Sequence, residues 1–184
     1  MFKVLIIFFI LNFYNSAFSS TKEKIISQMQ LTNNFSFNFI QTIKNKNENG
    51  KCIIKYPKKI WCKYDNSNKK IIVSNGKSLV IKNRNSGTYY IYPLRKTPLE
   101  FLLDKKYLIS KMSTLEPREI DNKYLNFTFF ENNNEINVFF DKKSLNLIGW
   151  QTQDIYQNLT ITFISTIKIN QKVDDKIFIL PKNN

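Results

Sequence analysis

The residues able to do chemistry are few, and the missing types exclude several mechanisms. The chain has 184 residues and no His, which excludes Ser-His-Asp and Cys-His catalytic centres and every His-ligated metal site. Its two Cys are too few for a four-Cys zinc site or an iron–sulfur cluster. Its four Gly form neither a dinucleotide-binding fingerprint nor a phosphate-binding loop. We therefore expect no metal and no cofactor.

The carboxylates offer no convincing catalytic pair. Asp174 and Asp175 are adjacent, and adjacent residues on a strand point to opposite faces, so they cannot share a substrate. Asp141 is followed by Lys142 and Lys143 and indicates a turn. The sequence therefore favours a binding protein over an enzyme.

The two cysteines flank a turn centred on Pro57. In a hairpin with that centre, Cys52 and Cys62 face each other, and their Cβ atoms can approach to the ~3.8 Å that a disulfide requires. Disulfides persist in oxidising compartments. We predict a Cys52–Cys62 disulfide; two buried free thiols are the alternative.

The charge is strongly basic but consists mainly of Lys. There are 28 Lys and Arg against 14 Asp and Glu, a net charge of +14, and only Arg84, Arg95 and Arg118 are Arg. Proteins that read nucleic acids rely on Arg for bidentate contacts. We therefore expect no nucleic-acid partner; diffuse positive charge suits a weak attraction to anionic membranes or acidic partners.

The N-terminus has the three parts of a secretory signal peptide. A short positive start at Lys3 precedes the apolar stretch 4–13, and Ala17 and Ser19 place small residues at the cleavage positions. The apolar stretch is shorter than the about 20 residues that span a bilayer, although an uncleaved anchor is the alternative. We predict a signal peptide over 1–19 and a single domain over 20–184. No Cys lies near the cleavage site, so we expect a released protein rather than a lipidated one.

Two helical segments interrupt a series of strands. Ser20 and Glu23 form a capping box for a helix over about 21–31. One or two short amphipathic helices begin with Thr97 as N-cap, followed by Pro98 and Glu100, and end near Met112. The hairpin signal Asn75-Gly76 and other turns, including one over 45–50, separate the strands. We expect strands at about 35–41, 51–56, 60–65, 70–74, 77–82, 88–92, 118–130, 135–141, 145–154, 158–168 and 173–180.

About eleven antiparallel strands predict a mainly β fold. A sheet of this length curls into an incomplete barrel, and the amphipathic helices bury their apolar side in its concave face as a lid. Lysines alternate with apolar residues on the second and third strands, so the even-numbered positions point inward. Trp61 then points outward, where it is a candidate contact for a partner. The predicted inward residues are Phe35, Phe37, Phe39, Ile54, Tyr56, Ile60 and Tyr64 from strands and Leu99, Leu102 and Leu103 from the helix. They form either a packed core or the lining of a lipid cavity.

The serial order of motifs resembles the outer-membrane lipoprotein carrier family, LolA. The matching pieces are Phe35-x3-Phe39-x-Gln41, Gly50 with Lys55-Tyr56-Pro57, residues 71–79, Thr97-Pro98-Leu99, Leu147-x-Gly149-Trp150 with Asp154, Asn158 with Thr160, and Ile177-Phe178. They extend over nearly the whole chain after residue 19.

The resemblance implies a half-barrel whose apolar cavity holds lipoprotein acyl chains. A periplasmic carrier of this kind takes acylated lipoproteins from an inner-membrane ABC transporter and passes them to an outer-membrane receptor, as a monomer without a cofactor. Many members have Arg immediately before the hairpin Pro as a lid latch; Tyr56 stands there in this chain and is the candidate latch. An envelope-stress sensor of similar fold and a general lipid or glycolipid binder are the alternative functions.

Overall fold

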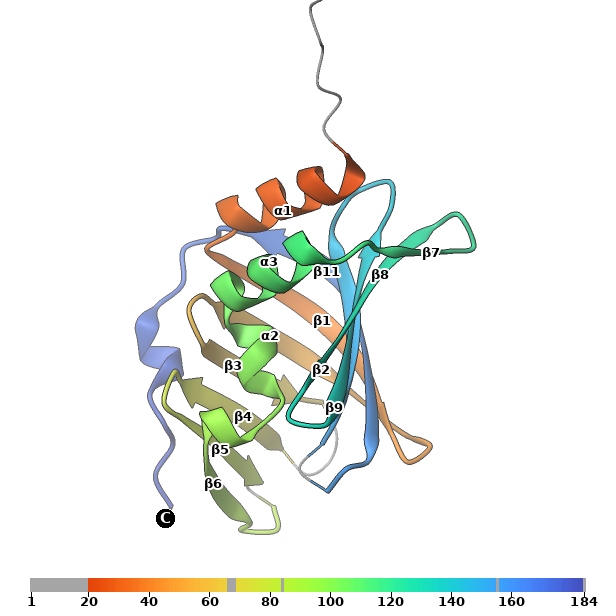
Figure 1. Ribbon diagram of the computed structural model, residues 1–184. Coiled ribbons are helices and arrows are strands. Elements are labelled where there is room, and N and C mark those ends of the chain that lie inside the picture. The colour runs from red at the N-terminus through yellow and green to blue at the C-terminus, as the bar shows by residue number, and fades with distance from the viewer. Residues whose placement is uncertain (1–19, 66–68, 84, 155, 184) are drawn as a thin grey trace, which may run out of the picture.

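One long antiparallel sheet curls around three helices in the computed structural model (Figure 1). The structure describes residues 20–65, 69–83, 85–154 and 156–183. The predicted signal peptide over 1–19 lies outside these described residues. The expected fold class, a mainly β incomplete barrel of eleven strands with a helical lid, is confirmed.

The strand order places the first and last strands together at the centre of the sheet. The order is β6-β5-β4-β3-β2-β1-β11-β10-β9-β8-β7. The strands are β1 (Asn34–Ile43), β2 (Lys46–Lys55), β3 (Lys59–Tyr64), β4 (Lys70–Asn75), β5 (Ser78–Asn83), β6 (Tyr89–Pro93), β7 (Arg118–Ile120), β8 (Tyr124–Glu131), β9 (Asn134–Asp141), β10 (Leu147–Gln153) and β11 (Leu159–Ile169). The two edge strands, β6 and β7, are consecutive in the chain, so the segment between them must cross from one edge of the sheet to the other.

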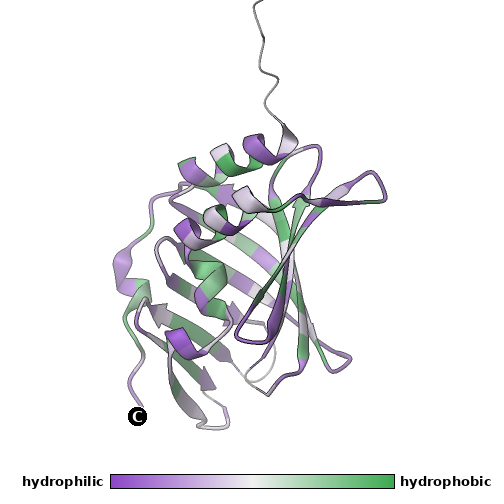
Figure 2. Cartoon of the chain, in the orientation of Figure 1, coloured by the Kyte–Doolittle hydropathy of each residue, from purple (hydrophilic) through white to green (hydrophobic). Residues whose placement is uncertain are grey.

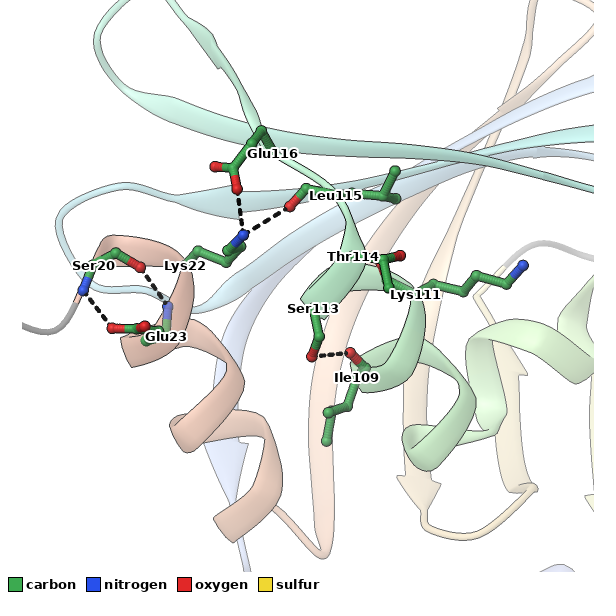
Figure 3. A network of polar contacts seen from close by, with 9 residues as sticks. All are labelled: Ser20, Lys22, Glu23, Ile109, Lys111, Ser113, Thr114, Leu115 and Glu116. Atoms are coloured by element: carbon green, nitrogen blue, oxygen red, sulfur yellow. Dashed lines mark hydrogen bonds and ion pairs between the residues drawn. The ribbon is translucent and has the colours of Figure 1, made fainter.

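That crossing segment forms the lid. It consists of η1 (Leu94–Lys96), α2 (Leu99–Leu103) and α3 (Lys105–Thr114), and α3 packs beside the N-terminal helix α1 (Thr21–Leu31). The capping box predicted for α1 is present, with Ser20 accepting from the Glu23 amide. Lys22 joins the two helices, because its ammonium group donates to the Leu115 carbonyl and pairs with Glu116 (Figure 3).

Two predicted strands differ from the structure, and their errors cancel in the strand count. The stretch 118–130 is not one strand, because Asp121 and Asn122 adopt left-handed backbone angles and form the turn between β7 and β8. The stretch 173–180 is not a strand; it contains the 3-10 turn η2 (Asp175–Phe178), which the Asp174 side chain caps by accepting from the Lys176 amide. The turn packs against β3 and β4 and buries Phe178, beneath the Nζ of Lys59.

Two smaller predictions are also wrong. The stretch 45–50 is mostly strand, since the left-handed residues Lys44 and Asn45 complete the turn and β2 begins at Lys46. Thr97 is not the N-cap of α2: Pro98 occupies that position, and the buried Thr97 hydroxyl donates to the Leu94 carbonyl at 2.8 Å. β2 starts at Lys46 because its first residues pair with β1. Thr97 does not cap α2 because its side chain is buried.

Candidate functional site

A cavity of about 350 Å³ lies under α2, between the concave faces of the strands on either side. Figure 2 shows apolar residues on α2 and on the strands beside it. This volume is at the lower end of the range of ~300–1,000 Å³ that is usual for ligand pockets. The apolar lining includes Phe37, Phe39, Ile60, Tyr64, Ile72, Leu79, Ile81, Leu99, Leu102 and Trp150, together with Cys52 and Cys62.

A glycine brings two aromatic rings of the wall together. Phe39, Gly50 and Tyr64 are cross-strand partners on β1, β2 and β3, and the two rings meet edge to face with centroids 4.9 Å apart. A Cβ atom on Gly50 would lie 2.2 Å from the carbonyl oxygen of Lys63, so a larger residue would push β2 and β3 apart. The backbones of β2 and β3 therefore lie too close for a side chain at residue 50. The rings of Phe39 and Tyr64 meet over this glycine and form a continuous apolar surface.

The disulfide lies in the adjoining row of the same wall. Cys52 and Cys62 are cross-strand partners on β2 and β3 and are joined by a disulfide. Phe37, the partner of Cys52 on β1, meets Trp150 of β10 edge to face at 5.9 Å between centroids. These residues connect the two halves of the sheet across the inner end of the cavity.

The mouth of the cavity is marked by its exposed lining residues. Tyr90 of β6 is 48% exposed, and Tyr156, in the turn between β10 and β11, is 69% exposed. Lys70 also lines this end; its ammonium group lies 3.8 Å from the centroid of the Tyr64 ring and pairs with Glu48. The cavity therefore runs from an apolar inner end to an opening with polar and aromatic residues.

Lys58, in the β2–β3 hairpin, holds α2 in place. Its backbone amide donates to the Leu103 carbonyl at 2.9 Å. Its ammonium group lies 2.5 Å from a Glu100 carboxylate oxygen and 3.2 Å from one of Asp104. The hydrogen bond to Glu100 is the largest cause that raises the pKa of Lys58, and the bond to Asp104 adds to it. One cation therefore connects the hairpin to both ends of α2.

The sequence-predicted lining residues fall into three groups in the structure. Those that reach the cavity are Phe37, Phe39, Ile60, Tyr64, Leu99 and Leu102. Phe35 and Tyr56 instead line a separate space of about 40 Å³ beside α1. Ile54 and Leu103 lie in the packed core, 3% and 0% exposed.

Tyr56, the candidate latch, lines the small space beside α1. Its ring packs 6.0 Å from that of Phe35, and the Nζ of Lys105 lies 5.6 Å from its centroid. Burial raises the pKa of the hydroxyl, which makes no hydrogen bond within the described residues. The polar contact between hairpin and α2 falls on Lys58, two residues further along the chain.

Sequence reasoning missed the lining residues of the distant strands. Trp150 and Thr152 of β10 and Thr160 and Thr162 of β11 all face the cavity. Their inward orientation follows from pairing of β11 with β1, where Gln41 lies opposite Thr162. Period-two alternation in 159–164 was the available signal, but it does not say which face is inward.

The described residues contain neither a metal-binding cluster nor a membrane-spanning helix. No group of three or more His, Cys, Asp or Glu among them could hold a metal ion. None of the helices they form is long and apolar enough to cross a membrane.

Comparison with known proteins identifies the family. A family model described as "Outer membrane lipoprotein carrier protein LolA" matches residues 30–180. An uncharacterized conserved protein from Thermus thermophilus shares the fold, with a TM-score of 0.52, 7% identity, and coverage of 89% of this chain and 96% of that chain. A LolA superfamily protein from Nitrosomonas europaea aligns with a TM-score of 0.47 and 10% identity, over 88% of this chain and 99% of its own. No curated protein sequence matches the chain.

Proposed function

The chain belongs to the LolA family of outer membrane lipoprotein carrier proteins, and we propose that it carries the acyl chains of lipoproteins through the periplasm. In this proposal it receives lipoproteins from an inner-membrane ABC transporter and delivers them toward the outer membrane, directly or through a receptor. The observation that supports this function best is the apolar cavity of about 350 Å³ under the short helix α2.

The cavity offers acyl chains an alternative to water. Each buried methylene group contributes about 0.8 kcal/mol, so a lipid-modified protein will not leave a membrane for water unaided. Leu99 and Leu102 of α2 already occupy part of the same apolar wall. Cargo and α2 therefore compete for it, and the net affinity is a difference that permits release to a better binding site.

The proposed location depends on residues 1–19. We propose that they form a cleaved signal peptide and that the protein works in the periplasm. The Cys52–Cys62 disulfide supports this location, because an oxidising compartment preserves such bonds.

The function can be tested by cargo release and by the material that copurifies. Leu99→Glu places a charge on the cavity wall from a half-buried position, and we expect it to abolish release of lipoproteins from spheroplasts. Leu31→Glu is the matched control, because Leu31 is 75% exposed at the end of α1. Circular dichroism should show that both variants remain folded. Unchanged release by folded Leu99→Glu would contradict the cavity as the cargo site.

Native mass spectrometry of protein purified from the periplasm distinguishes the carrier from a general lipid binder. We expect bound triacylated lipoprotein. Free phospholipid as the sole bound species would contradict the proposed cargo and favour general lipid binding.

A further inference from the structure

A strip of three threonines on β10 and β11 forms one polar part of the cavity wall. Thr152 and Thr160 are cross-strand partners on β10 and β11, and Thr162 lies one inward position further along β11. All three side chains line the cavity, and the residues are only 7%, 6% and 2% exposed. The strip begins beside the turn that carries Tyr156, so it lies toward the mouth.

The hydrogen bonds within this strip have a defined direction. The Tyr64 hydroxyl donates to Oε1 of Gln41 at 3.1 Å, which leaves Nε2 of Gln41 to donate to Oγ1 of Thr162, also at 3.1 Å. Burial, followed by the charge of Glu48, raises the pKa of Tyr64, so this phenol remains a donor. Thr162 is therefore an acceptor toward Gln41, and its own proton is available to the cavity.

Thr152 has unused hydrogen-bonding capacity. Its hydroxyl makes no hydrogen bond within the described part of the chain, although the residue is more than nine-tenths buried. Thr160 differs, since its hydroxyl donates to the Asn158 carbonyl at 3.4 Å. The Thr152 hydroxyl faces the cavity and is not among the fully buried atoms without a partner, so a ligand acceptor can reach it and bond it in place of water. Thr152 and Thr162 thus present two available donors on one wall.

The residues at the other end define where hydrocarbon would lie. Trp150 is the direct partner of Thr162, and it meets Phe37 at the inner end of the cavity, with Ile60 and Leu102 completing that region. A ligand with one apolar and one acceptor-bearing end can satisfy both regions in only one orientation.

We propose that the hydroxyls of Thr152 and Thr162 bind the carbonyl oxygen of the ester or amide that joins an acyl chain to its head group. The chain then enters first and lies against Trp150 and Phe37, while the head group stays at the mouth. This assignment rests on the proposed acyl-chain function and adds the chemistry that selects and orients the ligand.

Two lipids that differ in one carbonyl test the proposal. 1-Monododecanoylglycerol has an ester, and 1-O-dodecylglycerol has an ether in its place, with the same chain and head group. Their affinities can be measured by displacement of a fluorescent apolar dye from the purified chain. We expect the protein to bind the ester about tenfold more tightly, as one or two net hydrogen bonds would give.

Isosteric variants assign that preference to the hydroxyls. Thr152→Val with Thr162→Val removes both donors at nearly constant volume, and we expect it to reduce ester affinity to that of the ether while ether affinity holds or rises. Thr42→Val is the control: it is the same change on the outer face, where the Thr42 hydroxyl bonds Asn47, and it should keep the tenfold preference.

The possible failures are distinguishable. If neither lipid displaces the dye, acyl-chain binding itself is wrong and the inference falls with it. If both lipids bind the parent protein equally, acyl-chain binding stands and the carbonyl assignment is overturned. Equal loss of ester and ether binding in the double variant would mean that the hydroxyls only maintain the cavity shape, which also overturns the assignment.

Discussion

The two halves of the concave face are both covered by helices but are filled very differently. The half under α1 and α3 is densely packed: Ile25 of α1, Met112 of α3 and Phe127 of β8 are completely buried. Beneath α2, the strands β1–β6 carry equally large apolar residues, yet a cavity of about 350 Å³ remains. Hydrophobic content alone therefore does not decide whether a face becomes core or binding site.

The difference follows from the size of the covering elements. α1 and α3 have 11 and 10 residues, and α3 contacts β8 through the rings of Tyr107 and Phe129 and through Lys111 and Glu131. α2 has five residues, of which only Leu102 and Leu103 are buried. Protein interiors normally pack as densely as organic crystals. One short helix lacks the side-chain volume to reach that density over a strongly curved, aromatic sheet.

The largest expected effect is on the packed half. Phe127→Ala removes a ring that lies 5.8 Å from that of Phe140, and it should lower the free energy of unfolding by about 3–5 kcal/mol. Phe39→Ala makes the same change at the cavity wall and should cost less, because the new space joins an existing hollow. Urea denaturation measures both. Phe127→Leu serves if the alanine variant does not fold, and an equal cost at the two sites would contradict the distinction between them.

The second effect concerns how the hollow half is stabilised. Its disulfide links residues separated by ten positions, and such a loop contributes about 2–3 kcal/mol in the chain-entropy treatment. Cys52→Ser with Cys62→Ser should lower the melting temperature under oxidising conditions. In the presence of reductant the variant and the parent should melt together. A loss of equal size in reductant would show that the thiols act through packing rather than through the bond.

The sequence predicted the local features well and the cavity incompletely. The capping box at Ser20 correctly predicted the start of α1, and Asn75-Gly76 correctly predicted the β4–β5 hairpin. Each of these signals depends only on residues a few positions apart in the sequence. The threonines of the cavity wall were missed, since their orientation depends on the pairing of β11 with β1, more than 100 residues apart. The C-terminal stretch was mistaken for a strand because apolar residues there cover β3 and β4 from outside instead of pairing with an edge.

A third, smaller effect tests whether α2 is the movable part of the lid. Lys58→Met removes the charged contacts to Glu100 and Asp104, and it should weaken the attachment of α2 by about 1 kcal/mol. Hydrogen exchange of the α2 amides should accelerate, while the α3 amides stay protected. Tyr56→Phe is the control, because the Tyr56 hydroxyl makes no hydrogen bond within the described residues. Faster exchange in Tyr56→Phe alone would return the latch role to Tyr56.

The pH dependence of this contact has a predictable sign. The pKa of Lys58 is raised above its ordinary value of 10.5, so the folded protein holds this proton more tightly than the unfolded chain. The stabilisation is complete below pH 10.5 and is lost as pH rises through the higher folded pKa. Protection of α2 should therefore fall at alkaline pH in the parent protein but show no such step in Lys58→Met.

The smallest effect concerns the ion pair between α3 and β8 on the packed half. The ammonium group of Lys111 lies 2.5 Å from a Glu131 carboxylate oxygen and holds the pKa of that carboxyl below its ordinary value of 4.5. A lowered folded pKa means that the contribution is present above pH 4.5 and is lost as pH falls through the folded value. Glu131→Gln should cost about 0.5 kcal/mol at pH 7 and less at low pH, as measured by urea denaturation. Because burial rather than this pair holds α3, its amides should remain protected in the variant; an α3 that opened as readily as α2 would mean that the whole lid, and not one short helix, moves to admit cargo.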